Sequence, residues 1–152
     1  MNRKKLITLA GLGSAGLLLG AFAFQHIGGL PPCKMCIWQR YPHAIAIIIA
    51  VLAMAFPWRI LPLAGLMAAL TTAVVGFYHT GVERKWWEGP TSCTSGSVAD
   101  LTPQQLMEQI LAAPLIRCDD VAWSLMGLSM ASWNAVISLV LAAIWFAALR
   151  RN

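Results

Sequence analysis

Charged residues are scarce in this sequence: they make up 11% of its 152 residues, and only 6 are acidic. A typical soluble domain carries about 25% charged residues. Hydrophobic residues reach 59%, and the mean hydropathy is +0.67. One soluble core of this size could not bury so much apolar surface. The shortage of charge therefore excludes an ordinary soluble enzyme, a disordered chain and a disulfide-stapled secreted module, and it indicates a membrane protein.

Four apolar runs predict an all-α fold, an integral membrane four-helix bundle formed by one domain over residues 1–152. The runs cover about 6–27, 36–56, 60–80 and 123–149. A helix needs ~20 residues to cross a bilayer core of ~30 Å. The second run reaches that length only if its helix begins near Cys36, which would place this cysteine at the membrane interface. Glycines 11, 13, 16 and 20 of the first run predict close helix packing.

The basic residues predict the orientation of the four spans. The side with both termini and the 57–59 turn carries six basic residues and no acidic one, whereas the other side carries five basic residues and all six acids. Basic residues gather on the cytoplasmic side of membrane proteins. We therefore expect cytoplasmic termini in a bacterial inner membrane and periplasmic loops at about 28–35 and 81–122. This topology explains the net charge of +5 without nucleic acid.

Two local patterns refine this topology. Residues 1–23 also resemble a signal peptide with a cleavage site, but the apolar run is long for one, and cleavage would leave three spans. In the second loop, Thr102, Pro103 and Gln105 form a helix-start pattern. It predicts a short surface helix to about Ala112, lying on the bilayer surface or packed on the end of the bundle.

The four cysteines, Cys33, Cys36, Cys93 and Cys118, all fall in or beside the predicted periplasmic loops. Disulfides persist in that oxidising compartment, and four cysteines permit three pairings. A zinc site is disfavoured, because Cys93 and Cys118 lie far apart in sequence and no second C-x-x-C exists. Two interpretations remain: a membrane scaffold with structural disulfides, or redox catalysis. A C-x-x-C at a helix start favours the second, because a helix N-terminus stabilises a thiolate.

Arg40 adds to the redox interpretation. It follows Cys36 by four residues, so the two side chains share one helix face. A charge near the lipid boundary is costly and commonly functional. We expect the guanidinium to stabilise the Cys36 thiolate or a reduced acceptor; the alternative is an arginine that extends to the interface.

The residues around these cysteines resemble the DsbB family of disulfide-bond formation proteins. The similar segments are Phe24-Gln25-His26, Pro32 through Arg40, Gly76 through His79, Trp86 through Pro90 and Gly127 through Trp133. Trp38 stands where the family commonly has Tyr, and Gln39 where some members have an acidic residue. Neither change affects a redox atom.

This resemblance implies a thiol:quinone oxidoreductase that reoxidises a periplasmic DsbA-like partner of the thioredoxin fold. It implies that Cys93–Cys118 is the disulfide that faces the partner, and that Cys93 forms the mixed disulfide. Cys118 then exchanges with Cys33, and Cys36 becomes the thiolate that faces ubiquinone or menaquinone. Arg40 polarises the quinone, and His79 and Trp133 are candidates for its pocket. His26 and His43 receive no role. A vitamin K epoxide reductase-like protein is the rival family, although its loop cysteines precede the C-x-x-C.

Overall fold

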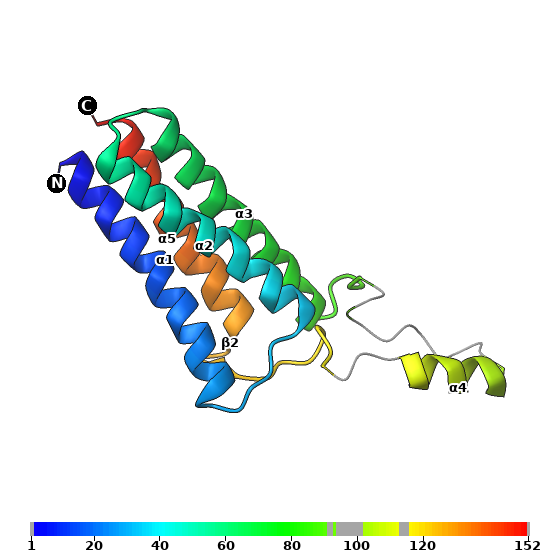
Figure 1. The fold of residues 1–152 in the computed structure, drawn as a ribbon. Coiled ribbons are helices and arrows are strands. Elements are labelled where there is room, and N and C mark those ends of the chain that lie inside the picture. Colours follow the sequence, from blue (N-terminus) through cyan, green and yellow to red (C-terminus); the bar gives the residue numbers. More distant parts are fainter. Residues whose placement is uncertain (1, 91–92, 94–101, 113–115, 152) are drawn as a thin grey trace.

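Four long helices lie side by side in the computed structural model, which describes residues 2–90, 93, 102–112 and 116–151. They are α1 (Arg3–His26), α2 (Lys34–Ala55), α3 (Ile60–Glu83) and α5 (Met130–Leu149). Each is long and apolar enough to cross a membrane. Both termini lie at one end of the bundle, and the loops that hold the cysteines lie at the other (Figure 1). The predicted all-α membrane bundle is confirmed.

Side chains at the helix starts explain where three of these helices begin. Asn2 accepts a hydrogen bond from the backbone N–H of Lys5, and Ser129 accepts one from Ser132. Cys33 does the same for Cys36, so the cysteine that precedes α2 is also its N-cap. Such caps satisfy the N–H groups that the first turn of a helix leaves free. The second span therefore begins before Cys36 and is long enough to cross the membrane.

The largest difference from the predicted spans is at residues 123–129, which do not form a helix. Here β1 (Ser124–Leu125) pairs antiparallel with β2 (Leu128–Ser129). Met126 and Gly127 have φ of 53° and 77°, which is typical of a two-residue hairpin turn. The last span consequently begins at Met130, because the hairpin and the Ser129 cap prevent an earlier start.

Small residues let the helices approach closely, as predicted, but not at every glycine. A Cβ on Gly11 would lie 2.7 Å from the Ala50 Cβ, and one on Gly65 would lie 2.5 Å from the Trp145 ring. Trp145 is fully buried between the helices. Gly16 and Gly20, in contrast, have no atom within 4 Å of such a Cβ. They border a cavity, so their missing side chains leave space rather than permit a helix contact.

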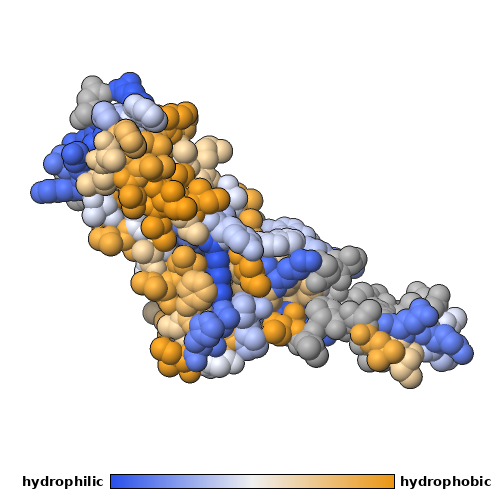
Figure 2. Space-filling model, viewed as in Figure 1, coloured by the Kyte–Doolittle hydropathy of each residue, from blue (hydrophilic) through white to orange (hydrophobic). Residues whose placement is uncertain are grey.

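Apolar side chains cover much of the bundle surface, and hydrophilic residues gather at the end with the termini (Figure 2). At that end Arg3 donates hydrogen bonds to the backbone oxygens of Pro57 and Trp58, 2.9 Å each. The predicted surface helix is present as α4 (Pro103–Ala112). Figure 1 shows it set apart from the four long helices. Its Met107 and Leu111 are exposed.

Candidate redox site

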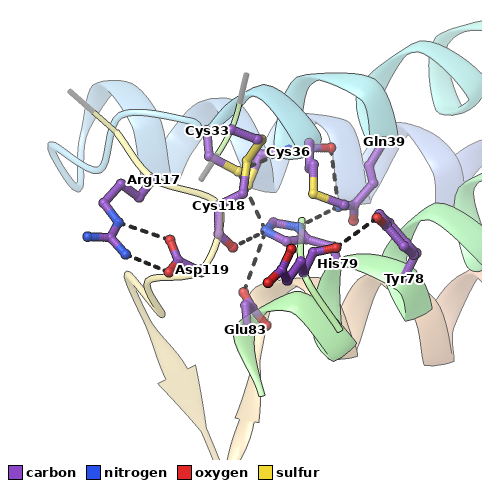
Figure 3. Close-up of a disulfide and its surroundings, with 12 residues drawn as sticks. Cys33, Cys36, Gln39, Tyr78, His79, Glu83, Arg117, Cys118 and Asp119 are labelled. Carbon is purple, nitrogen blue, oxygen red and sulfur yellow. Dashed lines mark hydrogen bonds and ion pairs between the residues drawn. A yellow bond between two sulfur atoms is a disulfide. The ribbon is translucent and has the colours of Figure 1, made fainter. Parts of the chain in front are cut away.

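The four cysteines meet at the loop end of the bundle, where they form one cluster. Cys93 and Cys118 form a disulfide. Cys33 and Cys36 are free thiols whose sulfurs lie 3.0 Å apart. The Cys33 and Cys118 sulfurs and the His79 ring nitrogen all lie within 4.8 Å of one another. Figure 3 shows this group between the start of α2 and the end of α3. A dithiol therefore faces a disulfide at a distance that a small movement would close.

Cys33 precedes the membrane-spanning helix α2, and it is the better nucleophile of the Cys33–Cys36 pair. The hydrogen bond that it shares with the Cys36 thiol, and the nearby His79 ring, lower the pKa of Cys33 to about 4 although burial opposes the shift. The backbone N–H of Cys36 also points at the Cys33 sulfur, 3.2 Å away. The thiolate is the attacking species in disulfide exchange. The start of α2 therefore favours a thiolate at the cysteine that faces the disulfide.

His79 is oriented by its neighbours toward the cysteines. Its Nδ1 lies 2.9 Å from the Gln39 amide nitrogen, which donates there because the same nitrogen faces the Met35 carbonyl oxygen. The proton of the neutral ring is then on Nε2. Nε2 lies 3.1 Å from the Cys118 carbonyl oxygen and 3.6 Å from the Cys33 sulfur. His79 can therefore donate to a Cys33 thiolate. The buried Glu83 carboxylate lies 3.9 Å from Nε2.

An ion-pair cluster holds the segment that carries Cys118. The Arg117 guanidinium donates to both oxygens of Asp119, at 3.0 and 2.6 Å, and Lys85 also pairs with Asp119. These cations hold the pKa of the Asp119 carboxyl below its usual range. Lys85 follows the end of α3, so the cluster ties the Cys118 segment to that helix. Cys93 is 1% exposed, so the chain around it must move before any large thiol-bearing molecule could reach its sulfur.

A cavity of about 220 Å³ opens on the other side of Cys36, between α1, α2 and α5. Cys36, Arg40 and Trp133 all line it. The Trp133 indole is fixed by a hydrogen bond to the Leu125 carbonyl oxygen. The described lining of the cavity does not include His79, which lies beside Cys33 instead. The predicted site residues thus divide into a cysteine cluster and a largely apolar cavity, with Cys36 next to both.

The Arg40 side chain extends from α2 and forms hydrogen bonds with residues of α1. It donates to the Gln25 side chain at 2.6 Å and to the Ala21 carbonyl oxygen at 3.3 Å, and its guanidinium lies 5.0 Å from the centre of the Phe22 ring. Its buried Nε has no hydrogen-bond partner within the described part of the chain. A charged donor left free inside a protein is costly. It therefore suits an acceptor oxygen of a molecule in the cavity.

Sequence reasoning missed Gln39, Asn134 and Glu83. Asn134 donates to the Gln39 side-chain oxygen at 2.8 Å, and Gln39 in turn contacts His79. The signal was available for Asn134, because an amide inside an apolar span must find a polar partner. The sequence around Gln39 offers no pattern that predicts its contact with His79. Glu83 enters the sequence analysis only as one of the acidic residues on the loop side of the bundle.

Known proteins bear out the resemblance seen in the sequence. The family model for disulfide bond formation protein DsbB matches residues 3–148. A disulfide bond formation protein B from Albidiferax ferrireducens is 30% identical over 159 residues, covering 97% of this chain and 91% of the relative. One from Pasteurella multocida is 32% identical, covering 92% and 85%. No solved structure matches the chain.

The family matches span all four long helices and both cysteine pairs. This coverage favours the DsbB family over a vitamin K epoxide reductase-like protein or a scaffold. Together with the geometry of the cysteine cluster, these matches show that the chain belongs to the DsbB family of disulfide bond formation proteins.

Proposed function

We propose that the protein is a thiol:quinone oxidoreductase of the bacterial inner membrane that reoxidises a DsbA-like partner. One observation carries the proposal: Cys33 lies beside the Cys93–Cys118 disulfide, whereas Cys36 lines the cavity. An aqueous dithiol and a lipid acceptor cannot meet directly. Two disulfides that lie close enough to exchange connect them. Cys93–Cys118 becomes accessible from the periplasm when the chain around it moves, and Cys33–Cys36 borders the cavity.

The partner's thiolate attacks Cys93, forms a mixed disulfide and releases Cys118 as a thiolate. Cys118 then attacks Cys33 of the oxidised Cys33–Cys36 pair, and Cys36 leaves as a thiolate. The second thiol of the partner resolves its bond to Cys93, so the partner leaves oxidised and the chain holds two electrons. The short distance between the Cys33 and Cys118 sulfurs supports this order of exchange.

The cavity suits a quinone head group by its apolar walls and by the free Nε of the buried Arg40. When bound, ubiquinone or menaquinone supplies an acceptor for two electrons and two protons. Cys36, Arg40 and Trp133 would hold it, and Arg40 would donate to one of its oxygens. His79 would act from the cysteine cluster, by stabilising a thiolate at Cys33.

Anaerobic stopped-flow kinetics test the proposal. The purified chain is mixed with a reduced DsbA-type protein and ubiquinone-1 or menaquinone-1, and quinone absorbance is followed. We expect stoichiometric reduction, which Cys36→Ser and Cys93→Ser abolish. Arg40→Met should slow the reduction about 10- to 100-fold, since a buried hydrogen bond from a charged group contributes about 1.5–3 kcal/mol. His26→Gln is the control, because His26 is exposed and outside the cavity.

Arg40→Met should leave the exchange between partner and Cys93 unchanged. No reduction of either quinone by the folded, unsubstituted chain would contradict the proposal and favour a scaffold with structural disulfides.

A further inference from the structure

His43 is a buried histidine in the wall of the same cavity. It takes no part in the proposed disulfide exchange, and it forms none of the hydrogen bonds described for Arg40. It follows Cys36 by seven residues, about two helical turns along α2. Its side chain is 3% exposed, and it lines the cavity together with Arg40 and Asn134. A polar ring in an apolar span normally pairs with another polar group.

One nitrogen of His43 is fully engaged. Its Nε2 lies 2.9 Å from the Asn134 side-chain oxygen, and the Thr72 and Ser138 hydroxyl oxygens lie farther away, at 3.3 and 3.5 Å. The direction of this bond is set by backbone carbonyls, which can only accept. The Met35 oxygen faces the Gln39 amide nitrogen, and the Thr72 oxygen faces the Asn134 amide nitrogen. The Gln39 side-chain oxygen therefore accepts from the Asn134 amide nitrogen. The Asn134 side-chain oxygen in turn accepts from His43 Nε2. The neutral His43 ring then carries its proton on Nε2.

The other nitrogen of His43 is left as a buried acceptor. Nδ1 has no hydrogen-bond partner within residues 2–90, 93, 102–112 and 116–151. Leaving a buried polar atom without a partner is unfavourable. A molecule that brings a donor into the cavity recovers this loss, and one that brings only acceptors does not.

Oxidised and reduced quinones differ in this respect. The carbonyl oxygens of a quinone only accept hydrogen bonds, whereas the hydroxyls of a quinol also donate. Arg40 Nε is a donor, so it serves both forms. The lone pair of His43 Nδ1 serves the quinol alone.

We propose that His43 Nδ1 accepts a hydrogen bond from a hydroxyl of the bound quinol, so that the cavity holds the reduced form more tightly than the oxidised form. This inference rests on the proposed quinone function. It makes His43 a binding residue for the product, fixed in the required tautomer by Asn134. Tighter binding of the reduced form favours electron transfer out of the cysteines by mass action.

Nitrogen NMR of the chain labelled with 15N-histidine tests the inference directly, since the sequence has only 3 histidines. The disulfide-bonded protein is titrated anaerobically with ubiquinol-1 and, separately, with ubiquinone-1, while absorbance verifies the redox state of each. We expect the His43 Nδ1 signal to move with ubiquinol-1 and to stay in place with ubiquinone-1. This arm needs no substitution, so it stands even if a His43 variant fails to fold.

Affinities from quenching of tryptophan fluorescence give the second arm, because Trp123 and Trp133 line the cavity. His43→Phe should weaken ubiquinol-1 about tenfold and change ubiquinone-1 less than about twofold, as expected for the loss of one buried hydrogen bond. His26→Phe is the matched control and should change neither.

Equal affinities for the two forms, with an unmoved His43 signal, would show that only water satisfies Nδ1; this would overturn the inference and leave the quinone function standing. Binding of neither form would overturn both.

Discussion

Cys33 and Cys36 are three residues apart, yet the structure gives them different surroundings. Cys33 caps α2 and lies beside Cys118, whereas Cys36 lies within the first turn and borders the cavity. Residues three apart in a helix are neighbours on one face. The pair can therefore border the disulfide with one sulfur and the cavity with the other at the same time, and only a small movement separates Cys33 from exchange with Cys118.

The low pKa of Cys33 predicts that its reactivity persists in mild acid in the form that has a free Cys33–Cys36 dithiol. An ordinary thiol has a pKa of about 8.5 and loses its thiolate below that pH. With the pKa of Cys33 lowered to about 4, the thiolate is present at higher pH and disappears only as the pH falls through about 4. We expect a rate of alkylation that is flat from pH 8 to about pH 5.

Mass spectrometry of the peptide that holds Cys33 measures this rate. His79→Gln should move the midpoint toward higher pH, because it removes a ring that stabilises the thiolate. His26→Gln should not. A midpoint near that of an ordinary thiol in the unsubstituted chain would contradict the assignment of Cys33 as the stabilised thiolate.

The site residues that could be predicted from the sequence are those whose spacing along a helix carries information. Cys36 and Arg40 lie four apart at a helix start, and both do line the cavity. The pairing of Cys93 with Cys118 could not be derived from spacing, because three pairings were possible. The contacts of Gln39 and Asn134 depend on how α2, α3 and α5 pack against one another, and a single sequence does not predict that packing. His79 is a predicted candidate for the quinone pocket, and in the structure Gln39 orients its ring toward Cys33, a contact that the sequence pattern does not give.

At the scale of elements, the spans were predicted better than their ends. Apolar runs mark the part of a helix inside the bilayer, and all four helices include such a run. Their ends depend on caps and turns. The run from Trp123 reads as one apolar stretch, but Gly127 and Ser129 convert its first residues into a hairpin and a cap. Likewise α3 continues to Glu83, since Glu83 pairs with Ser129 instead of facing water.

The packing of α3 against α5 gives a prediction about stability. A methyl group on Gly65 would collide with the buried Trp145 ring, whereas one on Gly16 meets open space. We expect Gly65→Ala to lower the free energy of unfolding by about 1–3 kcal/mol, as overpacking does. Gly16→Ala should be neutral or stabilising by up to about 1 kcal/mol, because alanine is the better helix former.

Denaturant titration of the two variants in detergent micelles makes the comparison. The substitution is the same in both, so the difference reports the local contact. Equal stabilities would show that the α3–α5 contact at Trp145 is looser than the structure has it.

At the scale of the whole molecule, the charge pattern predicts how the bundle lies in the membrane. Both termini and the 57–59 turn share one end, which carries Arg3 and Arg150 (Figure 1). We expect a phosphatase that is active only in the periplasm to be inactive when fused after residue 152 or at residue 58, and active when fused after residue 112. The opposite pattern would place the cysteines in a reducing compartment and contradict the proposed direction of electron flow.

The division between Cys33 and Cys36 is the central claim, and one trapping experiment tests it most directly. A DsbA-type partner that keeps only its attacking cysteine is mixed with the quinone-depleted, oxidised chain. The reaction is quenched in acid, free thiols are alkylated, and disulfide-linked peptides are mapped by mass spectrometry. Because Cys118 lies beside Cys33, we predict three products in one complex: partner linked to Cys93, Cys118 linked to Cys33, and a free Cys36. A Cys118–Cys36 linkage with a free Cys33 would contradict the account.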